Sequence, residues 1–186
     1  MKKFKFLIAL LIVPLLISAC SCQKQPTDRD HVELLVPDDV KGKVKDWVVY
    51  TNPAFRYELR SPENWEILDL NKTGEDVYFY EKGKSITDDY KGELRILGFS
   101  NWLEKLSIDE FIKSKAPTNY YAISAGEDRQ EIQFRDFYAI RFDNVEIAEN
   151  QLIDVLAIDG RDRIILIELR GTKKDIETIL GSMYFY

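Results

Sequence analysis

The stretch QLIDVLAIDGRDRIILIELR, residues Gln151–Arg170, contains two apolar segments separated by a turn signal. We predict strands over Gln151 to Ile158 and over Arg163 to Arg170. Asp159-Gly160 lies between them and is typical of a β-hairpin, because Gly adopts a positive φ at little cost. Ile164 to Ile167 is apolar without interruption. We therefore expect this second strand to be central in its sheet and covered on both faces.

The rest of the body shows the same strand signals, with helix signals at two places. Further strands are predicted over Trp47 to Tyr50, Phe55 to Ser61, Trp65 to Leu70, Asp76 to Glu81, Leu94 to Phe99, Tyr120 to Ser124, Glu131 to Phe134, Phe137 to Asp143 and, briefly, Tyr184 to Tyr186. Ser107 and Glu110 have the spacing of a capping box, which predicts a helix that ends before Pro117. A second helix is predicted over Lys173 to Ser182, with Thr172 as its cap. This composition predicts an α+β domain with an antiparallel sheet flanked by helices.

The N-terminus has the layout of a secretory signal peptide. Lysines at positions 2, 3 and 5 precede an apolar run, and Ile17-Ser18-Ala19-Cys20 follows it. This ending resembles the lipobox of bacterial lipoproteins. The resemblance implies cleavage before Cys20 and acylation of its sulfur and of the new N-terminus. Cys22 is the alternative lipidation site, although the residues before the cleavage point would then be Ala19-Cys20-Ser21, with a cysteine in the middle.

An uncleaved membrane anchor is the competing interpretation of the same residues. The run from Phe6 to Ala19 has 14 residues and is interrupted by Pro14, whereas a spanning helix needs about 20 apolar residues. Cleavage is therefore favoured. The expected organisation is a signal peptide over 1–19, a lipidated N-terminus and flexible tether over 20–46, and one domain over 47–186.

The tether is rich in polar residues, Pro and Gly. As a flexible coil, the 26 residues from Ser21 to Asp46 have an end-to-end distance of about 28 Å. His31, the only histidine of the chain, lies in this segment and is interpreted as a solvated side chain. Val32 to Val36 is apolar and is a candidate for docking on the body.

The charge of the chain disfavours several partners. The formal net charge is −6, and because the signal contains three lysines and no acids, its removal leaves −9. Such a surface repels phosphate-rich partners, so we expect no nucleic-acid binding. The same sign disfavours a body that lies flat on anionic lipid.

No strong catalytic set is visible in the body. From Trp47 onward the sequence contains neither His nor Cys, which disfavours zinc and His-dependent nucleophiles, and no Gly-rich phosphate loop occurs. We therefore expect no enzyme activity, no metal and no cofactor. Asp154, in an apolar strand, is either a general acid with a raised pKa or a residue that pairs with an Arg or faces solvent; the second interpretation is favoured.

Three other groups of residues are candidates for binding. Asp143, Asp159 and Asp162 carry oxygen ligands that suit calcium, but they do not form an EF-hand loop. The arginines at 135, 141, 161, 163 and 170 are expected in cross-strand ion pairs. Among the aromatic residues, which include Trp102, the pairs Tyr120-Tyr121 and Tyr78/Tyr80 are expected to leave one member exposed to a partner.

The segment from Tyr50 to Trp65, YTNPAFRYELRSPENW, resembles the opening of PsbP-like domains, and Ser182-Met183-Tyr184-Phe185 resembles their end. The sequence departs from the family pattern at Arg56 and Ser61. The resemblance covers 47–186 and implies an α/β/α sandwich with a non-catalytic accessory or binding role. It assigns no binding residue, because the matched positions are packing and turn positions.

The sequence therefore predicts a lipid-anchored extracytoplasmic lipoprotein on the cell membrane or outer membrane. Its body is expected to bind an envelope protein or component, which requires a contiguous exposed apolar patch. A small-ligand carrier, which requires an apolar pocket, and a carboxylate-dependent hydrolase, which requires two acids in a cleft, are the alternatives.

Overall fold

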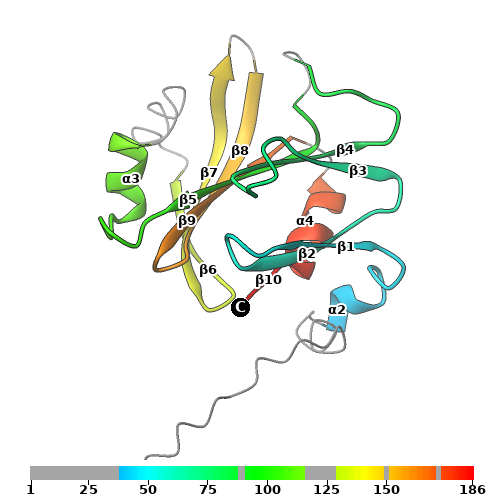
Figure 1. The fold of residues 1–186 in the computed structure, drawn as a ribbon, viewed down its shortest axis with the longest axis horizontal. Helices are drawn as coiled ribbons and strands as arrows, with labels where there is room; N and C mark the ends of the chain where they lie inside the picture. Colours follow the sequence, from blue (N-terminus) through cyan, green and yellow to red (C-terminus); the bar gives the residue numbers. More distant parts are fainter. Residues whose placement is uncertain (1–37, 88–90, 116–128, 149–150, 171–172) are drawn as a thin grey trace, which may run out of the picture.

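A computed structural model describes residues 38–87, 91–115, 129–148, 151–170 and 173–186. Its main element is an antiparallel sheet of seven strands in the order β3-β4-β5-β9-β8-β7-β6 (Figure 1). The strands span Trp65–Asp69 (β3), Asp76–Glu81 (β4), Leu94–Ser100 (β5), Arg129–Phe134 (β6), Phe137–Ala148 (β7), Gln151–Asp159 (β8) and Arg163–Leu169 (β9). The chain is thus an α+β protein built mostly from antiparallel strands, as predicted.

Strand β9 is the fourth strand of the sheet and is covered on both faces. Ile164 and Leu166 pack in one apolar cluster with helix α3 (Ile108–Ser114). Ile165 and Ile167 belong to a second cluster, which includes Ile179 of helix α4 (Lys173–Ser182). The prediction of a central, doubly covered strand is confirmed.

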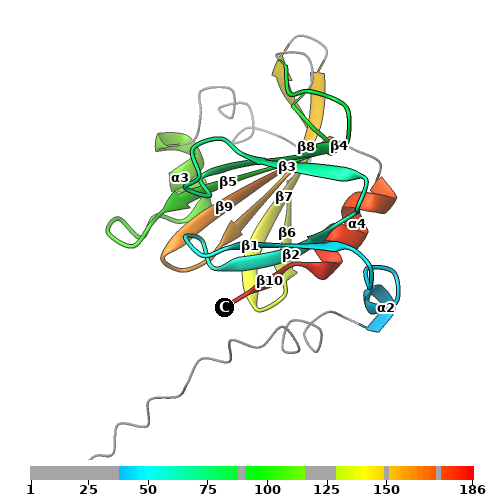
Figure 2. The same cartoon turned by 45° about the vertical axis from the view of Figure 1, so that its right-hand side comes forward.

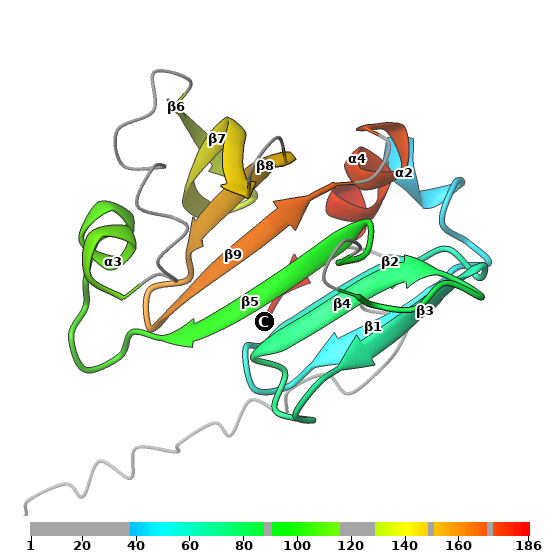
Figure 3. The same cartoon turned by 90° about the horizontal axis from the view of Figure 1, so that it is seen from above.

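The second face of the large sheet is covered by α4 together with a small sheet, as Figure 3 shows from above. This three-stranded sheet has the order β1-β2-β10, with bounds Val48–Asn52 (β1), Tyr57–Ser61 (β2) and Tyr184–Phe185 (β10). Tyr57 and Leu59 are buried from the alternating strand β2. The prediction of a sheet flanked by helices is therefore incomplete, because the alternating β2 and the chain end supply part of this cover.

The hairpin between β8 and β9 forms at Asp159-Gly160 as predicted, but for another reason. The residue with positive φ is Arg161, at 72°, and its N–H donates to Asp159 Oδ1 at 2.8 Å. Gly160 is required because a Cβ there would lie 2.6 Å from Cγ of Arg163. The close approach of the Arg163 side chain, rather than a left-handed backbone, explains the glycine.

Helix α3 begins as its sequence predicts. Ser107 Oγ accepts a hydrogen bond from the N–H of Glu110 at 3.3 Å, and Glu110 Oε2 accepts one from the N–H of Ser107 at 2.8 Å. The predicted helix Lys173 to Ser182 is also confirmed as α4. Pro117, Thr172, the strand Tyr120 to Ser124 and the segment Val32 to Val36 lie outside the described residues.

The folded body extends further toward the N-terminus than Trp47. Helix α2 (Asp38–Lys41) lies within the segment expected to be tether. Val40 and Val44 are buried and pack against Trp47, and a Cβ on Gly181 of α4 would lie 2.7 Å from Cγ2 of Val40. Residues 38–46 are therefore part of the body, because two valines spaced one helical turn apart are buried there.

Within the described residues, the helices are too short and too polar to cross a membrane.

Candidate functional site

The residues from Asn101 to Leu106 join β5 to α3, and we call this segment the contact loop. Trp102 is 61% exposed and Leu103 is 73% exposed, the highest values among the large apolar side chains that the structure describes. Both positions lie within three residues of Ser100, the last residue of β5. The contact loop therefore presents two adjacent apolar side chains to solvent.

The two ends of the contact loop are held together by the side chain of Asn101, which is only 4% exposed. Its Nδ2 donates to the carbonyl of Leu106 at 2.8 Å, and its Oδ1 accepts from the N–H of Leu106 at 2.9 Å. The N–H of Lys105, which has a φ of 50°, donates to the carbonyl of Asn101 at 2.9 Å. The exposed pair is thus carried by a closed loop with fixed ends.

Two turns lie beside the contact loop, and the three segments together form what we call the loop end. The N–H of Asn101 donates to the carbonyl of Asp162, in the turn 160–162, at 2.8 Å. Asp162 also pairs with Arg56, which belongs to the turn 53–56 between β1 and β2. Figure 2 shows the backbone of all three segments at the same side of the molecule: the connection from β5 to α3, the turn between β8 and β9, and the turn between β1 and β2.

The loop end contains several cations and a shared carboxylate. Asp162 pairs with Arg56 and, at 2.9 Å, with Arg163, whose side chain is 7% exposed. Burial raises the pKa of the Asp162 carboxyl, but the hydrogen bond from Arg56 and the charge of Arg163 outweigh it and lower the pKa. Burial and the charge of Arg56 lower the pKa of Arg163. Lys105 and Arg161 are exposed.

Asp154 lies in an ion pair rather than in an apolar site. Its Oδ2 accepts from Arg141 Nη2 at 2.9 Å, and its Oδ1 accepts from the N–H of Asn144 at 3.1 Å. Asn144 has a φ of 56° at the register shift in β7. The carboxylate of Asp154 therefore fixes a bulge, which agrees with the favoured interpretation and not with a general acid.

The three candidate calcium ligands are not brought together. Asp143 pairs with Arg141 at 2.6 Å near the register position of Asp154, whereas Asp159 is five residues further along β8, about 16 Å away in an extended strand. Asp159 and Asp162 are engaged by the turn and the arginines described above. Among the described residues, no group of His, Cys, Asp and Glu is arranged to hold a metal ion.

The expectation of cross-strand ion pairs holds for Arg141 with Asp154, whereas the ion pairs of Arg163 and Arg170 are with acids one and two positions away in the chain. Arg141 binds Asp143 and Asp154, Arg163 binds Asp162, and Arg170 binds Glu168. Arg135 instead donates to the carbonyl of Gly181. Their positions on separate strands and turns argue for a structural role.

The sequence interpretation missed a partly buried network on β4, β5 and β9. Arg95 binds Asp76 through Nε at 2.8 Å and through Nη2 at 2.9 Å, and binds Glu168 at 3.2 Å. The Glu168 side chain is 2% exposed. Because these two carboxylates accept hydrogen bonds from guanidinium groups, their arrangement is that of ion pairs across strands. The sequence signal for this network was Glu168, an acidic residue at the end of the apolar strand β9.

The predicted aromatic contacts differ from those observed. Tyr78 is 4% exposed, and Cζ of Arg95 lies 4.9 Å from the centroid of its ring. Tyr80 is partly exposed. Tyr120 and Tyr121, like the lipidation candidates Cys20 and Cys22, lie outside the described residues. Sequence reasoning did not single out Trp102 and Leu103, although an apolar pair outside any periodic element was a usable signal.

No family model matches the chain, and no curated protein matches it. Among solved structures, the chain is similar to the solution structure of cyanobacterial PsbP (CyanoP) from Synechocystis sp. PCC 6803, with 14% sequence identity, a TM-score of 0.47, and coverage of 75% of this chain and 92% of that chain. It is also similar to a crystal structure from Bacteroides thetaiotaomicron VPI-5482, with 10% identity, a TM-score of 0.44, and coverage of 74% of this chain and 48% of that chain.

Proposed function

We propose that the chain is a lipoprotein held on the extracytoplasmic face of a cell membrane or outer membrane by acylated Cys20. In this proposal the PsbP-like body is a non-catalytic accessory or binding module. Its contact loop binds an envelope protein or another envelope component. The signal-peptide layout that ends at Cys20 supports the location, and the resemblance of the body to PsbP-like domains supports an accessory role.

The observation that carries the binding role is the exposure of Trp102 and Leu103, at 61% and 73%, on a loop whose ends are closed by Asn101. Burying a Leu side chain at a contact contributes about 1.5–3 kcal/mol. Trp is among the residues most enriched at the centres of interfaces. Because the loop is already closed by hydrogen bonds, less conformational entropy is lost on binding than for an open loop.

The test is photo-cross-linking in cells that produce the full chain. A photoreactive amino acid replaces Leu103 in one variant and Leu152 in the matched control. Leu152 is also well exposed, at 59%, but lies on β8 near its hairpin with β7. We expect adducts with protein or with lipid from position 103 and few or none from position 152. Equal yields from the two positions, or none from position 103, would contradict the proposed role of the contact loop.

A further inference from the structure

The loop end combines an apolar tip with cations that the body does not neutralise. Lys105 and Arg161 are exposed, and neither side chain forms an ion pair with another described residue. Arg56 and Arg163 share the single carboxylate of Asp162. The same three segments also carry two acids, Glu104, which pairs with Lys115, and Asp162, so the positive charge at the loop end is a small excess that comes from Lys105 and Arg161. These two cations are therefore available to an anionic partner at this end, although the formal charge of the whole chain is −6.

The apolar part of the loop end is a tip rather than a broad surface. A stable protein–protein interface buries about 800 Å² on each partner and involves about 20–30 residues a side. Most of the other exposed large apolar residues lie on or next to β1, β3, β7 and β8, apart from the contact loop: Val48, Val49, Leu70, Tyr138 and Leu152. Tyr186, which is 40% exposed, is the exception, because its N–H donates to the carbonyl of Arg56 at 3.0 Å. Two adjacent side chains on a loop instead suit insertion into the interfacial zone of a bilayer, where Trp is enriched.

We propose that the loop end docks on the phospholipid bilayer that carries the lipid anchor. Trp102 and Leu103 insert among the headgroups, and Lys105 and Arg161 lie against anionic lipid phosphates. This inference rests on the proposed function and names the bilayer as the component that the contact loop binds. In this arrangement the acidic body contacts the bilayer through one end only and does not lie flat on it.

The chain between the anchor and the body is long enough for this orientation. Figures 1 and 3 place α2 and α3 at opposite sides of the body, so the loop end is distant from the point where the tether joins. Cys20 to Pro37 comprises 18 residues, which span about 60 Å when fully extended. A compact body of this size is about 40 Å across. The loop end can therefore touch the same bilayer as the anchor.

The experiment uses the full chain, purified with its own anchor and reconstituted into vesicles of phosphatidylcholine and phosphatidylglycerol. In a Cys22→Ser background, Leu103→Cys carries an environment-sensitive fluorophore, and Leu152→Cys carries the same label as a control. The Cys22→Ser chain without a second substitution measures the background labelling. We expect a blue shift and about threefold less quenching by aqueous iodide at position 103 than at position 152.

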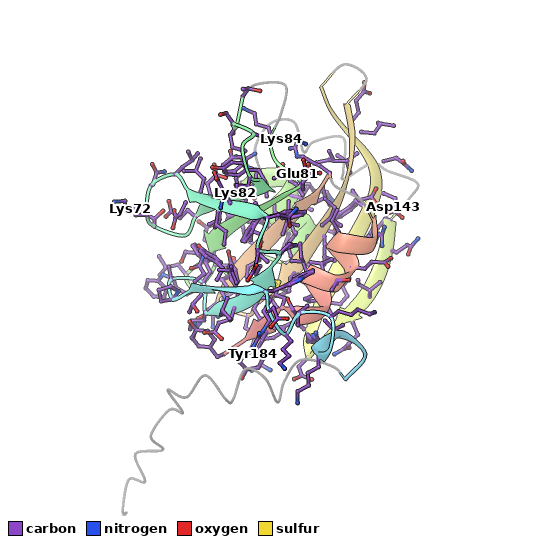
Figure 4. All side chains as sticks on the ribbon, turned by 90° about the vertical axis from the view of Figure 1, so that its right-hand side faces the viewer. Lys72, Glu81, Lys82, Lys84, Asp143 and Tyr184 are labelled. Carbon is purple, nitrogen blue, oxygen red and sulfur yellow. The ribbon has the colours of Figure 1, made fainter. Side chains whose placement is uncertain are left out.

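A second pair of variants tests the cations. Lys105→Gln/Arg161→Gln should lose about half or more of the protection at position 103, and raised salt should have the same effect. Lys43→Gln/Lys82→Gln removes the same charge from exposed positions away from the contact loop (Lys82 is labelled in Figure 4) and should change the protection little. Equal losses in the two double variants would overturn the assignment of these cations.

The outcomes separate this inference from the proposed function. If the label at position 103 is as accessible as that at position 152 while photo-cross-links in cells join position 103 to a protein, the bilayer inference is wrong and the binding role of the loop stands. If position 103 is accessible and also gives no cross-link, both are wrong. Protection at position 103 on vesicles that contain no other protein supports the bilayer.

Discussion

Asn101 makes two hydrogen bonds to the same residue, Leu106, one through each polar atom of its amide. Asn101 is 4% exposed, and the burial of its amide would cost free energy if it had no such partners. Each bond also fixes a backbone group at the far end of the contact loop. Trp102 and Leu103 can therefore stay in water without collapsing onto the body, because the backbone that carries them is fixed by buried polar contacts.

The lipid anchor gives a prediction about a single residue. Cys20→Ala should leave an unprocessed precursor without acylation, because the thiolate that accepts the lipid is lost. Cys22→Ala, the matched control two positions away, should be processed and acylated normally. Metabolic labelling with a fatty acid and the size of the product on a gel measure both outcomes. Lipidation of Cys20→Ala together with its loss in Cys22→Ala would assign the anchor to Cys22.

Residues whose role follows from a known sequence motif could be predicted, and those whose role depends on how a side chain is placed in space could not. The capping box of Ser107 and Glu110 is local, and its prediction is confirmed. The role of Gly160 was misjudged, because the side chain that approaches it follows the turn into β9. Asn101 was not identified, since nothing in the sequence shows that its amide is buried.

At the scale of elements, strand β9 was predicted correctly because four adjacent apolar residues leave no face for solvent. Helix α2 was not predicted. It has only four residues, and no amphipathic pattern can be recognised over so short a span. Its burial depends on α4, more than a hundred residues later in the chain.

The contact between α2 and α4 gives a prediction about Gly181. A Cβ at this position would lie 2.7 Å from Cγ2 of Val40, so Gly181→Ala should displace α2 although Ala favours a helix. We expect a loss of about 1–3 kcal/mol, as for other overpacked sites, and faster tryptic cleavage after Lys41 and Lys43. Urea unfolding and limited proteolysis measure the two effects.

The matched control is the double variant Val40→Ala/Gly181→Ala, which removes the obstructing methyl groups. Its loss of stability should be smaller than the sum of the two single losses, because the added Cβ fills space that Val40 has vacated. Strict additivity, or a Gly181→Ala protein as resistant to trypsin as the parent, would show that α2 does not pack closely on α4.

At the scale of the whole molecule, polar groups that have hydrogen-bond partners lie beside the apolar clusters on both sides of the large sheet. Arg95 connects β4 and β9 through Asp76 and Glu168, and the ring of Tyr78 lies against its guanidinium. On the other side, Asn52 donates from Nδ2 to Tyr57 Oη at 3.1 Å and to the carbonyl of Gly74 at 2.9 Å. Buried tyrosine side chains therefore lie on both sides of the large sheet, so the stability of the fold should depend on pH in the alkaline range.

Burial raises the pKa of Tyr78 to about 12 and raises that of the fully buried Tyr57 well above 10. A raised pKa means that the folded state holds the neutral phenol. Its stabilising contribution is complete below the unfolded pKa of about 10 and is lost as the pH rises through the folded pKa. The free energy of unfolding should therefore fall above about pH 10, by about 1.4 kcal/mol per pH unit for each such tyrosine. Urea unfolding at a series of alkaline pH values measures this slope.

Tyr57→Phe isolates one of these phenols. Asn52 keeps its hydrogen bond to the carbonyl of Gly74 in this variant, so the fold should survive. The alkaline slope should become shallower by about 1.4 kcal/mol per pH unit, because no phenol remains at position 57 to ionise on unfolding. Tyr184→Phe is the control, since it removes a phenol from a partly exposed position on β10 (Figure 4), and it should change the slope less than Tyr57→Phe does. If Tyr57→Phe and Tyr184→Phe give the same slope as the parent chain, Tyr57 does not stay neutral in the folded state.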